Sequence, residues 1–177
     1  MQQLQKHTFS LFSIRGVIRK KYPPKHTKAV HALEINSNIL NEYLVNQFNL
    51  PRGRKKNLSV PNSFKQDKNI LRWYLVGLYD ADGTLPKNGT TCKQLFIDIT
   101  LKDKELVQDI KNILKETFSI ETLKLYKRVA KSPHSDYISE TWELRIRRRS
   151  EILKFLKEVG FFHPHKHRRM TLILKDQ

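Results

Sequence analysis

The segment Leu75-Val76-Gly77-Leu78-Tyr79-Asp80-Ala81-Asp82-Gly83 ends the most apolar helix candidate of the chain, residues 68–83. Gly77 and Ala81 stand four positions apart, so they share one face of this helix. Both have almost no side chain, and small residues at this spacing allow two helix backbones to pack closely. We expect Leu78 to take part in the same contact. The segment therefore predicts a helix that pairs with a second helix.

Asp82 falls at the C-terminal end of this helix, where the helix dipole disfavours negative charge. An acid in such a place usually has a compensating cation, and Gly83 is expected to end the helix in the left-handed conformation. Two such helices side by side would bring two carboxylates of this kind together. Carboxylate oxygens suit Mg²⁺, and paired metal ions can activate water and stabilise the leaving 3′ oxygen of a phosphodiester.

Leu75–Gly83 resembles the LAGLIDADG motif of a family of homing endonucleases, with conservative differences at Val76 and Tyr79. The approach to the segment, Val60-Pro61-Asn62-Ser63-Phe64, and the basic stretch Pro164–Arg169 are also similar to that family. The resemblance covers residues 70–172 well and residues 28–60 in part.

This resemblance implies a site-specific endonuclease of double-stranded DNA that acts in intron homing. It implies that Asp82 is catalytic and binds the metal ions with help from the carbonyl of Ala81. The implied cofactor is Mg²⁺, which Mn²⁺ can replace. A basic residue near the scissile phosphate is also implied, and Lys166 matches that position best. Where the family often has a glutamine after the second strand, this chain has Leu101 followed by Lys102.

From residue 70 onward, the apolar patterning predicts the order helix, two strands, helix, two strands, helix. This order predicts an α+β domain (α-β-β-α-β-β-α) with helices on one face of an antiparallel sheet, and the resemblance implies that the sheet is saddle-shaped. After the first helix, the predicted elements are a strand at Gln94–Leu101, a helix at Lys104–Thr117, strands at Thr122–Val129 and Tyr137–Arg147, and a helix at Ser150–Val159.

The N-terminal part has a different pattern. It predicts strands at Phe9–Ile18 and Ala29–Ile35, and then a short helix at Asn38–Gln47 that Ser37 or Asn36 caps. We expect residues 1–67 to be an extension or a partial first repeat, and residues 68–177 to be the endonuclease domain. The pattern of residues 29–56 recurs loosely at residues 142–169, which leaves a true repeat and chance similarity both open.

The charge of the chain points to a polyanionic partner. Lys and Arg number 34 against 17 acids, a formal net charge of +17, and nucleic acid is the commonest partner for such a surface. Strand alternation turns polar rows outward, where Arg and Lys can read guanine and Gln can read adenine, unless these rows are only solvated. The expected DNA contacts are Lys87, Lys93, Gln94, Asp98, Thr100, Lys124, Tyr126, Arg128, Arg145, Arg147, Arg168 and Arg169.

Phosphate contacts are expected from a partly overlapping set: Arg148, Arg149, Lys154, Arg168 and Arg169. His163, His165 and His167 alternate in a way that suggests zinc, but no second ligand pair stands near them in the sequence, so contact with phosphate is favoured. The single cysteine, Cys92, excludes an internal disulfide and favours a reducing, intracellular space. The expected location is the cytoplasm of a prokaryote, an archaeon first, or an organelle matrix, with no membrane partner.

The chain contains one motif, whereas cutting both DNA strands needs two. The favoured interpretation is a homodimer formed through the Leu75–Gly83 helix, with an N-terminal extension. A second interpretation is a shortened double-motif enzyme that has lost its first catalytic helix. A third is a catalytically inactive nucleic-acid-binding protein, such as an intron RNA maturase.

Overall fold

The computed structural model describes residues 2–21, 30–48, 50, 58–86, 95–131 and 138–175. The chain divides into two compact units, Met1–Leu50 and Pro51–Gln177, which we call the first and second units. None of the helices within these described ranges is both long and apolar enough to cross a membrane.

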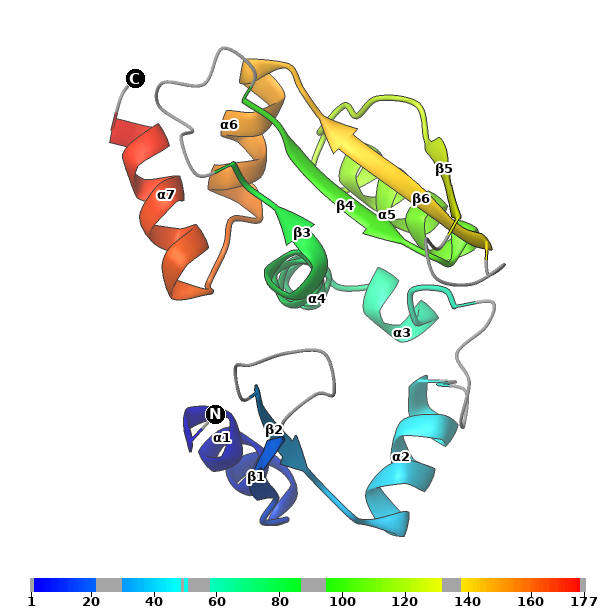
Figure 1. The fold of residues 1–177 in the computed structure, drawn as a ribbon, viewed down its shortest axis with the longest axis vertical. Helices are drawn as coiled ribbons and strands as arrows, with labels where there is room; N and C mark the ends of the chain where they lie inside the picture. Colours follow the sequence, from blue (N-terminus) through cyan, green and yellow to red (C-terminus); the bar gives the residue numbers. More distant parts are fainter. Residues whose placement is uncertain are drawn as a thin grey trace. The chain divides into compact units, whose positions relative to one another are not determined.

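The first unit contains an antiparallel pair of strands between two helices (Figure 1). The pairing runs from Val17 opposite Glu34 to Lys21 opposite Val30. The hydroxyl of Ser37 accepts the N–H of Leu40 at 3.2 Å, which confirms Ser37 as the cap of the second helix. The elements are α1 (Gln2–Phe12), β1 (Val17–Lys21), β2 (Val30–Glu34) and α2 (Asn38–Phe48).

The strand predicted at Phe9–Ile18 is wrong over its first part, because α1 continues to Phe12. The N–H of Ser13 closes the last turn on the carbonyl of Phe9 at 2.8 Å. Ser13 then ends the helix with a φ of 53°. A short run of apolar residues fits either a helix or a strand, and the sequence alone could not separate the two periods.

The second unit has the predicted α+β order, with a four-stranded antiparallel sheet in the order β3-β4-β6-β5. It begins with a short helix that the sequence did not predict, and it ends with a helix that follows Gly160. The elements are α3 (Asn62–Lys65), α4 (Lys68–Asp82), β3 (Gly83–Thr84), β4 (Ile97–Leu101), α5 (Lys104–Glu116), β5 (Tyr126–Lys131), β6 (Ile138–Ile146), α6 (Arg149–Glu158) and α7 (Pro164–Lys175).

One face of the sheet is covered by helices, as predicted. In Figure 1, α5 lies behind β4 and β6. Helix α5 carries a strongly apolar stripe, and strand residues of one parity meet it in the core. The buried residues are Leu106, Val107, Ile110, Ile113 and Leu114 of α5, and Ile97, Ile99, Leu144 and Ile146 of the strands. The other strand residues therefore face away from these helices.

The start of one strand differs from the prediction. Strand β5 begins at Tyr126 rather than Thr122, because the preceding residues bond elsewhere: Leu123, for example, donates its N–H to the carbonyl of Arg145 at 2.8 Å. The first compact unit ends at Leu50. The N–H of Leu58 donates to the carboxylate of Asp103 at 2.7 Å, which ties this segment to the second unit.

A glycine turns the chain from α6 towards α7. Gly160 has a φ of 75°, in the left-handed region. A Cβ atom added there would lie 3.1 Å from the carbonyl oxygen of Leu156 and 3.2 Å from the sulfur of Met170. Pro164 is the first residue of α7, a position that suits proline. Lys166 therefore lies in the first turn of α7.

Tyr79 joins α4 to α6 in the core. Its ring centroid lies 4.8 Å from that of Phe155, and the whole residue is buried. Among the residues that the structure describes, no group forms a hydrogen bond with its hydroxyl. Burial, with a further contribution from Asp98, raises the pKa of this hydroxyl above its usual range.

We predict that Tyr79→Phe raises the free energy of unfolding by about 1 kcal/mol, because it removes a buried polar atom that has no partner. Urea unfolding measures the change, with Tyr74→Phe as the control, since Tyr74 is only half-buried and its ring packs on Phe64. A loss of stability in Tyr79→Phe would contradict the prediction and would indicate a bound internal water.

Candidate functional site

Helix α4 has one buried side and one bare side. Asp67 caps its first turn, because the carboxylate accepts the N–H groups of Asn69 at 2.7 Å and Ile70 at 3.2 Å. The inner side buries Leu71, Leu75, Val76 and Tyr79.

The bare side contains the small residues of the motif. Ile70 is 43% exposed and Trp73 is 55% exposed, and both Gly77 and Ala81 are exposed further along the helix. A Cβ atom added at Gly77 would meet nothing within 4 Å. Within the part of the chain that the structure describes, nothing therefore requires a glycine at this position. Leu78 is half-buried at the margin of this side. The prediction that this face pairs with another helix stays a prediction.

Gly83 ends α4 in a different way from the one predicted. Its φ and ψ are −78° and 156°, which is extended rather than left-handed. It continues directly into β3, where it pairs with Ile99. A Cβ atom there would lie only 2.6 Å from the carbonyl oxygen of Tyr79. Glycine is required at this position by close approach to the preceding turn and not by backbone handedness.

Asp82 is the last residue of α4 and is exposed, as is Ala81 before it. Its carboxylate makes no hydrogen bond or ion pair with any residue that the structure describes. Within the same described ranges, no group of three or more His, Cys, Asp or Glu side chains is arranged to hold a metal ion. A cation bound by Asp82 would therefore take further ligands from water, from phosphate or from another protein chain.

The side chain of Lys166 caps the C-terminal turn of α4. Its Nζ atom donates to the carbonyl oxygens of Tyr79 at 2.8 Å, Asp80 at 2.8 Å and Gly83 at 2.6 Å. This ammonium is the compensating cation that an acidic helix end requires. Burial lowers the pKa of Lys166 below its usual value, while the carboxylates of Asp80 and Asp82 oppose that change. Its predicted role beside the scissile phosphate stays a prediction.

Asp80 makes the reverse connection, from α4 to the start of α7. Its carboxylate accepts the N–H groups of Phe162 at 3.1 Å and His163 at 2.8 Å. Arg169, which was predicted to bind DNA, donates to the carbonyl oxygen of Leu85 at 2.9 Å, just after β3. Lys166 and Asp80 thus attach α7 and the residues before it to the last turn of α4, and Arg169 attaches α7 to the segment after β3.

The open face of the sheet holds arginines that are fixed by buried acids. Arg145 lies opposite Asp98 in the ladder, and its guanidinium contacts that carboxylate at 3.2 Å and the carboxylate of Glu143 at 2.5 Å. Arg128 forms an ion pair with the other oxygen of Glu143. The ring of Phe96 lies 4.5 Å from the guanidinium carbon of Arg145. These contacts fix the direction in which the two guanidinium groups point.

Asp98 is on the predicted face, but it is not an outward contact. It is 7% exposed and Glu143 is 5% exposed, so both acids are covered. Alternation along a strand determines which face a residue occupies, but it does not determine whether a longer neighbour covers it. The register of β4 and β6 is the information that this prediction lacked, because it places Asp98 opposite Arg145.

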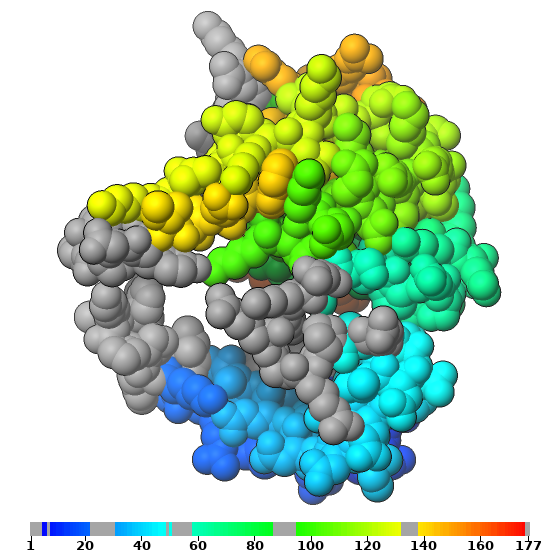
Figure 2. All heavy atoms as spheres, turned by 90° about the vertical axis from the view of Figure 1, so that its right-hand side faces the viewer, coloured from blue at the N-terminus to red at the C-terminus, as the bar shows by residue number. Residues whose placement is uncertain are grey.

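Beside these arginines the surface is hollowed. A depression of about 500 Å³ is lined by Leu123, Lys124, Tyr126, Arg128, Glu143 and Arg145. Figure 2 shows the yellow atoms of β5 and of the first half of β6 at the surface of the second unit. Four of the predicted DNA contacts therefore come together at one place: Lys124, Tyr126, Arg128 and Arg145.

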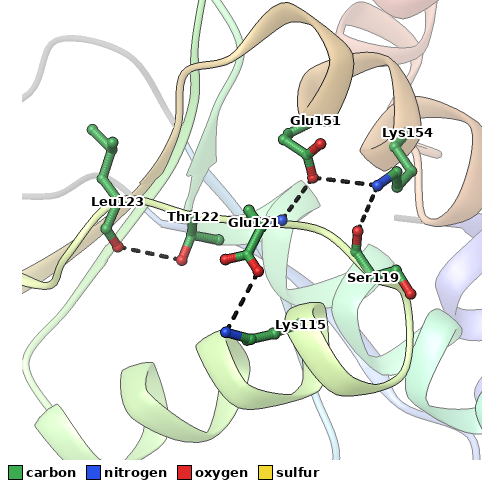
Figure 3. A network of polar contacts seen from close by, with 7 residues as sticks. All are labelled: Lys115, Ser119, Glu121, Thr122, Leu123, Glu151 and Lys154. Carbon is green, nitrogen blue, oxygen red and sulfur yellow. Dashed lines mark hydrogen bonds and ion pairs between the residues drawn. The ribbon is translucent and has the colours of Figure 1, made fainter.

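The segment that enters this depression is anchored to α6 (Figure 3). Glu151 accepts the N–H of Glu121 at 2.7 Å. Lys154 donates to the carbonyl oxygen of Ser119 at 2.6 Å and contacts Glu151 at 3.5 Å. Lys154 was expected to hold phosphate, but its ammonium makes these contacts within the chain. Sequence reasoning missed this network, because its members lie about 30 positions apart.

The remaining predicted contacts have various environments. Arg147 and Arg168 are exposed, and Thr100 is half-buried on the open face of the sheet. His163 and His165 are exposed with ring centroids 5.7 Å apart. Lys87, Lys93 and Gln94 lie outside the described residues.

The contacts of Glu151 in Figure 3 indicate that its contribution to the free energy of unfolding depends on pH. The N–H of Glu121, and then Lys154, hold the pKa of Glu151 below its ordinary value of 4.5 against the opposing effect of desolvation. We expect Glu151→Gln to lower the free energy of unfolding at pH 7. This difference from the wild type should be fully present above pH 4.5 and should disappear as the pH falls through the lowered pKa.

Urea unfolding at pH 7 and pH 3 measures this difference. Glu116→Gln is the matched control, because Glu116 is an exposed acid at the end of α5. A difference of equal size at both pH values would show that the charge of Glu151 is not its cause.

Comparison with known proteins covers the unit that contains these features. A family model described as a LAGLIDADG-like domain matches residues 69–160, which is more than half of the chain. The match includes α4, the sheet and α6, while α7 and the first unit lie outside it. A search of curated proteins finds no match.

Proposed function

Because this chain belongs to the LAGLIDADG family of homing endonucleases and maturase-like proteins, we propose that it is a site-specific endonuclease that hydrolyses double-stranded DNA with divalent metal ions. The observation that carries the proposal is the position of Asp82. Its carboxylate stands exposed at the end of the motif helix, and no described residue pairs with it. A carboxylate that forms no hydrogen bond or ion pair with a described residue, in a chain of net charge +17, suits a cation that is shared with phosphate.

The cofactor is Mg²⁺, which Mn²⁺ can replace. Asp82 supplies a carboxylate and Ala81 a carbonyl, both of them hard oxygen ligands of the kind that these ions prefer. When bound, the metal activates a water molecule and stabilises the leaving 3′ oxygen. The chain itself orients the ligand, because Gly83 and the core contacts of Tyr79 fix the turn in which Asp82 lies.

DNA binds over the open face of the sheet. Arg145 and Arg128 are held by Glu143, so they are pre-oriented for hydrogen bonding to guanine in the major groove. Lys124 and Tyr126 line the adjacent depression. Arg147 and Arg168 are exposed and contact phosphate or base edges. Lys87, Lys93 and Gln94 are proposed to extend this surface on the strength of the sequence alone.

Two chains form the complete enzyme. Each chain contributes one motif, and the bare side of α4 presents Gly77 and Ala81 with Ile70 and Trp73 beside them. A second copy that packs on this side brings a second Asp82 close to the first. This arrangement provides one metal-binding carboxylate for each DNA strand.

We predict that Asp82→Asn reduces DNA cleavage by about 100-fold or more, because it removes the charge of a metal ligand. The substrate is a plasmid that carries the uninterrupted insertion site of the gene, incubated with and without Mg²⁺. Retained DNA binding by Asp82→Asn, measured by gel shift, shows that the loss is chemical. Glu116→Gln is the matched control, an exposed acid at the end of another helix, and should cut as the wild type does.

The result for the wild type decides between the family's activities. Linear product supports the dimeric endonuclease, and nicking alone supports a shortened double-motif enzyme. Tight nucleic-acid binding without any Mg²⁺-dependent cleavage would overturn the proposal in favour of a binding protein such as an intron RNA maturase.

A separate prediction concerns the dimer. Gly77→Leu should fold, because the space around Gly77 is open and leucine favours a helix by about 0.8 kcal/mol over glycine. It should nevertheless prevent two α4 helices from packing closely. We expect light scattering to give a dimer for the wild type and a monomer for Gly77→Leu, with Lys157→Leu on exposed α6 surface as the control. A dimeric Gly77→Leu would exclude this interface.

A further inference from the structure

Three hydrogen bonds occupy the ammonium group of Lys166. A lysine side chain has three N–H donors, and Lys166 directs them to three separate carbonyl oxygens of residues 79, 80 and 83. A further bond to a phosphate oxygen or to an attacking water would require the loss of one of these bonds. In this arrangement Lys166 is a group that holds backbone and not one that faces a substrate.

The three acceptors surround Asp82 along the chain. The carbonyls of Tyr79 and Asp80 precede it, and the carbonyl of Gly83 follows it. The last carbonyls of a helix have no partner within the helix; the carbonyl of Tyr79 accepts the N–H of Gly83, and Lys166 adds donors to this turn from outside. Lys166 supplies such donors on both sides of Asp82. The backbone on both sides of Asp82 is thereby held from α7.

Asp80 strengthens the same connection in the opposite direction. Its carboxylate receives the N–H groups of Phe162 and His163, just before α7 begins. Helix α7 thus contributes the ammonium group of Lys166, and α4 contributes the carboxylate of Asp80. Both contacts are made at the last turn of α4. Helix α7 lies beyond residue 160, where the family match ends, so this connection is seen in the structure and not in the matched segment.

We propose that Lys166 is a positioning residue, which fixes the turn of α4 that carries Asp82 and so sets the affinity of that carboxylate for its metal ion. This inference rests on the proposed function, in which Asp82 is a metal ligand. Lys166 acts on the reaction through the backbone of residues 80–83 and does not touch the scissile phosphate. Asp80 completes the connection by holding the start of α7 against the same turn.

The test compares Lys166→Met with the wild type in the full-length protein. We expect the affinity for Mn²⁺, measured by electron paramagnetic resonance, to fall about 10- to 100-fold, as for other residues that orient a metal ligand. The rate of DNA cleavage should fall at low Mn²⁺ and recover towards the wild-type rate at saturating Mn²⁺. In the metal-free protein, amide exchange at residues 82 and 83 should become faster. Lys175→Met, on exposed surface of the same helix, should change none of these.

Two results would overturn the inference. Unchanged Mn²⁺ affinity with cleavage lost at every Mn²⁺ concentration would make Lys166 a catalytic residue instead. Unchanged affinity and unchanged cleavage would leave it no role at the site. If Lys166→Met does not fold, Lys166→Arg replaces it: the planar guanidinium keeps the charge but cannot converge on three carbonyls in the same way, so a smaller change in the same direction is expected.

Failure of the proposed function is distinguishable from failure of this inference. If Asp82→Asn binds Mn²⁺ as tightly as the wild type does, Asp82 is not a metal ligand and the proposed function fails. Amide exchange in the metal-free Lys166→Met protein would then decide separately whether Lys166 holds this turn. A weaker affinity in Asp82→Asn combined with a wild-type affinity in Lys166→Met would overturn the inference alone.

Discussion

The division of α4 into a buried and a bare side is the constraint on which the second unit depends. Leu71, Leu75 and Tyr79 are almost completely buried, so the helix cannot rotate without exposing them to water, at about 25 cal/mol for each Å² of apolar surface. This fixed rotation decides that Gly77 and Ala81 face outward. It also fixes the side of the molecule on which Asp82 emerges. The core packing and the candidate site are therefore two sides of one helix.

On the open face of the sheet, pairing between arginines and buried acids limits both the charge and the orientation of the arginines. The chain has an excess of 17 positive charges, yet the arginines on the open face of the sheet are accompanied by covered acids. Asp98 and Glu143 remain buried because Arg145 and Arg128 pair with them, and a buried charge without a partner would be costly. The acids reduce the local positive charge and in return restrict the guanidinium groups to few orientations. Such restriction favours selective contact over general attraction to polyanions.

The sequence was informative wherever one period dominated a long segment. The apolar stripes of α4 and α5 and the alternation of β4 gave the correct elements, because each buries a continuous face. Failures occurred where tertiary contacts choose between local alternatives. The residues from Phe9 to Phe12 fit a strand as well as a helix, and Gly83 fits an extended end as well as a left-handed one. Pairings between distant residues, such as Lys154 with Ser119, leave no local pattern at all.

The long reach of Lys166 has a consequence for biosynthesis. Its acceptor Tyr79 lies 87 positions earlier in the sequence. Asp80 is separated from its partners Phe162 and His163 by a similar number of residues. Chains emerge from the ribosome N-terminus first, and contacts across long sequence separations form late. The motif helix can therefore enter the nascent core while its final turn still lacks its cap. The turn that carries Asp82 thus gains the Lys166 cap only after the residues of α7 have been synthesised.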